Sequence, residues 1–322
     1  MLLVQAGASS NRAKPSPNAG PVCTRIFRVG FVADVAGLDA AAGWRGVRDS
    51  LRGLPCARAD VAVANRPAQY PQLLQAYARH DLVIAGSFLL TDAVVEAARA
   101  NPATRFVLVD PIVAPVAQPN LAVLVFRDDQ AAFLAGALAA MVSRTGVIAG
   151  VYGPFGAADQ RHRSGFEHGA AYVRRGIHVL GAYQPADDGL PYASPGWGAA
   201  QARAFVRQGA DVIFGTGGST GTGALRGAAQ AGGRCIGDGD SATDPAVGDC
   251  LLASTIKHVD RGVALMVADA AAGHWAGGTR SLGLAEGAVE LGLLPRQLPP
   301  EQLDELQAIV AKLAAGALAT GA

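Results

Sequence analysis

Short apolar runs alternate with segments of helical periodicity along almost the whole chain. The apolar runs are continuous, which is typical of strands that are buried on both faces of a parallel sheet. The segments between them repeat apolar residues every three or four positions, as amphipathic helices do. Strands are predicted at 28–33, 59–63, 81–85, 105–109, 121–126, 146–151, 177–181, 211–214, 234–237 and 250–255. Helices are predicted at 43–53, 69–79, 90–100, 128–143, 160–174, 198–208, 221–231 and 258–272.

The predicted elements form two series with the same plan. One series opens with strand 28–33 and the second with strand 146–151. Two short strands around a turn at 280–290 and a helix at 301–315 follow them. This order predicts an α/β protein with two doubly wound parallel-sheet lobes around a central cleft. The predicted division is a flexible tether at 1–25, lobe 1 at 26–126 plus 255–284, and lobe 2 at 127–254 plus 285–322.

Length and composition fit this division. The chain has 322 residues, of which 50% are hydrophobic and 16% are charged, as in globular proteins of two ordinary domains. The net charge is +1 and no basic stripe is present, which argues against nucleic acid as a partner. No apolar run reaches the roughly 18–20 residues that span a bilayer. Residues 1–4 are too short for the apolar core of a secretory signal, and Cys23 lacks the small preceding residue of a lipidation site.

The four cysteines fall into two short-range pairs. Cys23 and Cys56 enclose the first strand and helix, and Cys235 and Cys250 flank the loop 238–249. We predict disulfides Cys23–Cys56 and Cys235–Cys250 in an oxidising compartment, the alternative being four buried thiols. The six histidines have no recognisable ligand spacing, so we expect no structural metal.

A glycine-rich turn follows the predicted strand 211–214. Gly217, Gly218, Thr220 and Gly221 lie where backbone N–H groups at a helix N-terminus can approach a ligand. Close packing of helix on strand is the alternative interpretation. The turn does not follow the first strand and no P-loop lysine comes after it, so it is a weak nucleotide motif.

Further candidates lie where predicted strands end. Asp34, Asp110, Asp238 and Asp240 are carboxylates that can accept hydrogen bonds from ligand N–H or O–H groups. Their alternative role is to cap helices or order turns. Ser87 and Phe88 follow strand 81–85. Phe88 is expected either to line a pocket or to belong to the core.

Several blocks in order make the chain similar to a known family. They include Val29–Asp34 followed by Gly37, Gln130–Ala140 (Gln-Ala-Ala-Phe-Leu-Ala-Gly-Ala-Leu-Ala-Ala), Thr220–Gly223 and Ser254–Asp260. With these blocks the sequence resembles, over roughly 28–315, the basic membrane protein family of PnrA-like substrate-binding lipoproteins of ABC transporters. The resemblance implies a type I periplasmic-binding-protein fold.

The same resemblance implies a function without catalysis or cofactor. Family members bind purine nucleosides in the interlobe cleft. The family aspartate that binds the ribose hydroxyls corresponds to Asp238 or Asp240 in this chain. Lys257 matches a family lysine that either binds ligand or forms a hinge ion pair. The family's Phe-Asn segment after the first strand is missing here, where the chain reads Gly37–Trp44.

The resemblance therefore implies an extracytoplasmic, membrane-anchored protein, although no anchoring signal is evident. It would capture a nucleoside-like ligand by hinge closure, as a monomer, and deliver it to an ABC permease. A ligand-sensing domain of the same fold is the alternative. An enzyme is disfavoured because the chain has no nucleophile elbow and no first-strand nucleotide fingerprint.

Overall fold

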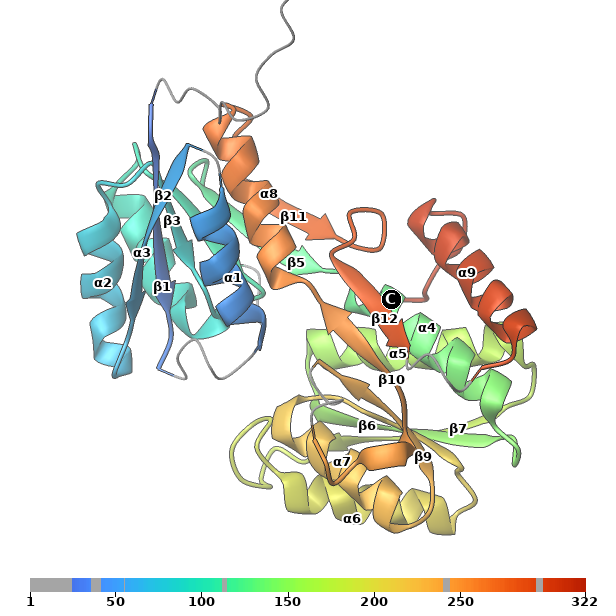
Figure 1. Cartoon of the computed structure of the whole chain (residues 1–322). Helices are drawn as coiled ribbons and strands as arrows, with labels where there is room; N and C mark the ends of the chain where they lie inside the picture. The colour runs from blue at the N-terminus through green and yellow to red at the C-terminus, as the bar shows by residue number, and fades with distance from the viewer. Residues whose placement is uncertain (1–24, 36–41, 55, 112–114, 240–243, 294–297) are drawn as a thin grey trace, which may run out of the picture.

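The chain folds into two lobes, each built on a six-stranded sheet with helices on both faces (Figure 1). The predicted α/β class and periplasmic-binding-protein fold are confirmed by this architecture. The computed structural model describes residues 25–35, 42–54, 56–111, 115–239, 244–293 and 298–322. The predicted tether and the candidates Cys23, Gly37 and Asp240 lie outside these ranges.

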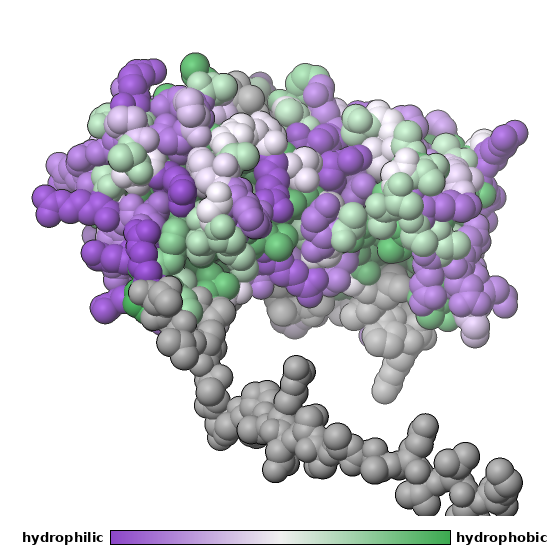
Figure 2. Space-filling model, turned by 90° about the horizontal axis from the view of Figure 1, so that it is seen from above, coloured by the Kyte–Doolittle hydropathy of each residue, from purple (hydrophilic) through white to green (hydrophobic). Residues whose placement is uncertain are grey.

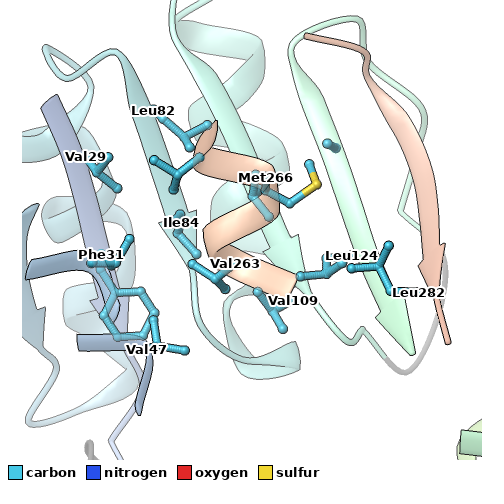
Figure 3. Close-up of a cluster of buried hydrophobic side chains, with 14 of the residues drawn as sticks. Val29, Phe31, Val47, Leu82, Ile84, Val109, Leu124, Val263, Met266 and Leu282 are labelled. Carbon is cyan, nitrogen blue, oxygen red and sulfur yellow. The ribbon is translucent and has the colours of Figure 1, made fainter. Parts of the chain in front are cut away.

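Sheet A forms the first lobe, and all of its strands are parallel. In spatial order it contains β11 (Gly278–Leu282), β5 (Leu121–Phe126), β4 (Arg105–Val109), β3 (Leu82–Ala85), β1 (Phe27–Ala33) and β2 (Ala57–Val63). One face is covered by α1 (Ala42–Gly53) and α8 (Val259–Ala271), the other by α2 (Tyr70–Tyr77) and α3 (Thr91–Ala100). Figure 3 shows the first of these interfaces, where Val47 of α1 and Val263 of α8 pack against Phe31 and Ile84.

Sheet B forms the second lobe. In spatial order it contains β12 (Val289–Leu293), β10 (Leu251–Lys257), β9 (Arg234–Asp238), β8 (Val212–Gly215), β6 (Val147–Pro154) and β7 (His178–Gln184), and only β12 is antiparallel to its neighbour. The helices on one face are α4 (Asp128–Val142), α5 (Ala157–Val173) and α9 (Pro300–Ala314). The helices on the other are α6 (Pro195–Arg207) and α7 (Gly218–Gln230).

Helices α4 and α5 approach one another closely because glycine faces the contact. A Cβ at Gly169 would lie 1.9 Å from the carbonyl oxygen of Phe133, so only hydrogen fits there. Residues 131–140 of α4 are buried all around the helix, because sheet B, α5 and α9 surround them. The Gln130–Ala140 block therefore forms part of the buried core of lobe 2.

Within the residues that the structure describes, the chain crosses between the lobes at three places, which are Arg127, 257–258 and 283–288. The two strands predicted around 280–290 exist, but β11 belongs to sheet A and β12 to sheet B, so the turn between them is itself a crossing. Residues 255–257, expected to begin the return to lobe 1, pair within sheet B as part of β10.

The exterior mixes residue types. Seen from above, hydrophilic and hydrophobic residues are interspersed over the surface (Figure 2). Among the described residues, no helix is both long and apolar enough to cross a lipid bilayer. The predicted disulfide Cys235–Cys250 is present, with the two Cα atoms 5.5 Å apart. Cys56 is also disulfide-bonded, and its pairing with Cys23 stays a prediction because Cys23 is outside the described residues.

Candidate ligand-binding site

The candidate residues gather at the carboxyl ends of strands, where open α/β sheets bind ligands. In lobe 1, Asp34 follows β1, Ser87 and Phe88 follow β3, and Asp110 follows β4. In lobe 2, the glycine-rich turn follows β8, Asp238 ends β9 and Lys257 ends β10.

Four charged side chains meet where the lobes join, and we call Asp110, Asp128, Arg161 and Lys257 the junction cluster. The Lys257 ammonium lies 2.5 Å from Asp110 Oδ2 and 3.2 Å from Asp128 Oδ2. An Arg161 guanidinium nitrogen lies 3.8 Å from the same oxygen of Asp128. Asp110 follows a strand of sheet A, whereas Lys257 ends a strand of sheet B. The cluster therefore joins the two lobes by alternating charges.

The surroundings keep Lys257 charged. Burial acts to lower the pKa of Lys257, but the carboxylates of Asp110 and Asp128 outweigh it and raise that pKa well above its usual value. The nearby charge of Asp238 acts in the same direction. Asp238 itself accepts a hydrogen bond of 2.8 Å from the Thr255 hydroxyl.

Asp110 has an unusual backbone. Its φ of 52° lies in the left-handed region, which a non-glycine residue adopts only when its surroundings fix it. The Asp110 N–H donates to the carbonyl of Leu124 at 2.8 Å, and its carboxylate is held by Lys257. Strained residues of this kind concentrate at functional sites, which supports a role for Asp110 beyond ordering a turn.

Tyr192 lies at the centre of a hydrogen-bond network on lobe 2. Its hydroxyl donates to the buried carboxylate of Asp159 at 3.3 Å, and its N–H donates to the Gln184 side chain at 3.0 Å. Its carbonyl accepts from the N–H of Ser219 at 3.0 Å. The fully buried Thr220 also donates to Gln184, at 2.8 Å. These bonds hold Tyr192 at a φ of 63° and link the segments that follow β6, β7 and β8.

A charge of the junction cluster also acts on the pKa of Tyr192. Burial and the neighbouring charge of Asp159 raise the pKa of Tyr192 to about 12, and the charge of Asp110 adds to the increase. Asp110 belongs to lobe 1, so the pKa of Tyr192 responds to a charge of the other lobe. Burial also raises the pKa of Asp159, and the charge of Asp238 adds to it.

The glycine-rich turn approaches the protein's own backbone closely. A Cβ at Gly217 would lie 2.4 Å from the nitrogen of Gly153, and one at Gly218 would lie 2.9 Å from the carbonyl oxygen of Tyr192. A Cβ at Gly221 would meet backbone atoms at 2.6 Å. Packing therefore accounts for glycine at these positions, and a ligand contact through their N–H groups stays a prediction.

An exposed aromatic ring lies at the strand ends of each lobe. Phe88 is 38% exposed next to Ser87, whose buried hydroxyl accepts from the N–H of Leu89 at 3.2 Å. Phe155 follows β6, is 70% exposed and packs edge-on against Tyr183 with centroids 5.3 Å apart. Asp34 is half-buried after β1. A cavity of about 210 Å³ lies elsewhere, between α8 and β11, and is lined by Met266, Asp269 and residues 274–280.

Comparison with known proteins identifies the family. Residues 70–316 match the family model of PnrA-like ABC transporter substrate-binding proteins. The chain belongs to this family, whose members bind substrates rather than transform them.

Individual relatives agree with this assignment. Basic membrane protein B of Borrelia garinii is 32% identical over 154 residues, which are 47% of this chain and 44% of that protein. The alignment thus spans less than half the length of this relative. The solute-binding protein of an ABC transporter from Aeropyrum pernix superposes with a TM-score of 0.67 at 22% identity, covering 91% of this chain and 92% of that one. A transcriptional activator of the comK gene from Bacillus halodurans superposes with a TM-score of 0.76 at 17% identity, covering 91% and 99%. Identities this low show the shared fold alone.

Three site residues escaped the sequence reasoning. Asp128 opens a helix one residue after a strand ends, a position that sequence alone assigns to helix stabilisation. Asp159 lies in the first turn of α5, one residue before the predicted start of that helix. Tyr192 lies between elements, in a segment without periodicity. The one available hint was an aromatic residue within a stretch rich in proline and glycine.

Proposed function

We propose that the chain is the substrate-binding component of an ABC importer and captures a small polar ligand between its lobes. One observation carries the proposal: Lys257 at the end of a sheet B strand contacts Asp110, which follows a sheet A strand. Functional groups from both lobes therefore meet at the edges where such sheets bind ligands. Family membership supports the same role.

The chemistry of the candidate groups favours a nucleoside-like ligand. Asp238 is a carboxylate that can accept hydrogen bonds from two neighbouring sugar hydroxyls. The exposed rings of Phe88 and Phe155 offer flat apolar faces from opposite lobes. Stacking of a base on an aromatic side chain contributes about 1–3 kcal/mol. These two aromatic rings would replace the missing Phe-Asn segment after β1.

The proposal includes the steps around binding. The protein would act outside the cytoplasm, anchored to the membrane and monomeric, and would pass its ligand to a membrane permease. Lobe closure about the three crossings would enclose the ligand. The junction cluster lies at these crossings, so ligand binding and closure would act on the same charges.

A thermal-shift screen tests the proposal. Purified protein is heated with purine nucleosides, pyrimidine nucleosides, free bases and common sugars. A ligand at 100 times its Kd stabilises the fold by about 2.7 kcal/mol, which gives a visible shift. We expect a shift with a purine nucleoside that Asp238→Ala abolishes and that Asp304→Ala, an exposed carboxylate on α9, leaves unchanged. The absence of a thermal shift with every nucleoside would contradict the proposed ligand class.

A further inference from the structure

Arg127 is the whole of the first crossing between the lobes. β5 ends at Phe126 and α4 begins at Asp128, so one residue connects sheet A to lobe 2. Its N–H donates to the carbonyl of Leu282, the last residue of β11, at 2.8 Å. Rocking of one lobe against the other must change the backbone angles of such a residue, as hinge motions do. Whatever fixes Arg127 therefore restrains the lobes.

The Arg127 side chain is fixed by a buried carboxylate. Its Nε lies 2.9 Å from Asp129 Oδ1, and its Nη2 lies 2.6 Å from Asp129 Oδ2. Asp129 is only 1% exposed. Burial acts to raise the pKa of Asp129, but hydrogen bonds from Arg127 and Thr320 outweigh it and leave that pKa below its usual value. The carboxylate therefore stays charged at neutral pH, and it accepts hydrogen bonds from both Arg127 and Thr320.

The second donor to Asp129 comes from a segment distant in sequence. The Thr320 hydroxyl donates to Asp129 Oδ2 at 2.5 Å, and Thr320 is 2% exposed. Thr320 lies in the segment 315–322, which follows α9. The next residue, Gly321, accepts at its carbonyl from the Ser164 hydroxyl of α5 at 2.8 Å. The segment is thereby docked on α4 and α5.

A parallel connection reaches the third crossing. The buried Gln130 side chain accepts from the N–H of Leu284 at 2.9 Å and donates to the carbonyl of Leu313 at 3.4 Å. Leu284 belongs to the crossing 283–288, and Leu313 lies in the last turn of α9. Two adjacent residues of α4 thus tie two crossings to the region around the end of α9.

We propose that the segment 315–322 is a hinge clasp, in which Thr320 acts through Asp129 to position Arg127 and so restrains the relative motion of the lobes. Thr320 and Asp129 belong to neither the junction cluster nor the strand-end candidates. The clasp therefore acts on the lobe equilibrium whatever the ligand proves to be.

Hydrogen exchange of the full, ligand-free chain tests the clasp. Thr320→Val keeps the side-chain shape and removes the hydroxyl. We expect amides of residues 126–130 and 283–288 to exchange at least tenfold faster, with those of β3 and β8 unchanged. Thr320→Ser, which keeps the hydroxyl, should restore slow exchange. Thr145→Val, at an exposed turn hydroxyl that bonds to Val147, is the matched control and should leave both crossings unchanged.

Two results would overturn the clasp. Faster exchange confined to 315–322, with both crossings as slow as before, would show that the segment does not restrain them. Equally faster exchange in β3 and β8 would show a general loss of stability. If Thr320→Val does not fold, Ser164→Ala is the substitute variant, because it removes the hydrogen bond between the Ser164 hydroxyl and the Gly321 carbonyl in the same segment. It should raise exchange at the crossings about threefold, and unchanged crossings in that variant would refute the clasp.

Discussion

Replacing Lys257 with methionine should destabilise the protein measurably. Methionine keeps an apolar stem near the Phe126 ring, over which the ammonium lies at 5.4 Å, but removes the charge. Asp128 is 4% exposed, and its Oδ2 accepts no hydrogen bond from any described group, so Lys257 at 3.2 Å is its main counter-charge. Removing one partner of a buried ion pair costs about 3–5 kcal/mol. Because the Lys257 and Asp110 side chains are 28% and 29% exposed, we expect the low end, about 3 kcal/mol.

Urea unfolding followed by tryptophan fluorescence measures this loss. The midpoint should fall, while the slope of free energy against urea stays the same. Because the pKa of Lys257 lies above its usual value, the lysine is charged throughout the neutral range, and the loss should be equal at about pH 6 and about pH 9.

A double-mutant cycle separates charge from packing. Asp128→Asn removes the charge that Lys257→Met leaves unpaired, so the double variant should recover at least about 1.5 kcal/mol relative to the sum of the single variants. The reasoning would be refuted by a loss below about 1 kcal/mol in Lys257→Met, or by strictly additive effects.

Three further predictions concern stability. Asp211→Ala should cost about 1–3 kcal/mol, because the carboxylate accepts from the Ser143 hydroxyl at 2.7 Å and from two N–H groups. Burial acts to raise the pKa of Asp211, but these hydrogen bonds outweigh it and leave that pKa below its usual value, so the wild-type advantage should fade only as the pH falls below about 4. The free energy of unfolding should decrease between about pH 10 and pH 12 in the wild type, because the pKa of Tyr192 is raised to about 12 and the folded state favours its protonated form. Tyr192→Phe should make this decrease smaller, and an unchanged pH profile would contradict the prediction. Cys235→Ala with Cys250→Ala should cost about 3 kcal/mol by urea unfolding, because the bridge closes a loop of 15 residues, and a cost near zero would argue against the bridge in solution.

The fold could be predicted from the sequence because the patterns that define its strands and helices are local. Continuous apolar runs such as 105–109 and 212–215 are fully or almost fully buried strands, and the helical periodicity between runs matches the faces that pack on the sheets. What the sequence could not place was the partner of each strand. β11 and β12 are neighbours in sequence but lie in different sheets, because long-range packing and not local pattern decides which edge a strand joins.

The candidate site could be predicted from the sequence only in part, for a related reason. Asp110 and Lys257 could be singled out because each stands next to a strand end, but their contact joins residues 147 positions apart. Asp128 lies in the first turn of a helix, where a carboxylate has an ordinary structural role. Tyr192 owes its place to hydrogen bonds with Gln184 and Ser219, which no periodicity encodes.

Small-angle X-ray scattering with and without a saturating purine nucleoside tests the central claim most directly. If the ligand binds between the lobes and draws them together, the radius of gyration must fall on binding, and Asp238→Ala must abolish the fall. A nucleoside that binds by calorimetry while the scattering profile stays unchanged would contradict capture by lobe closure.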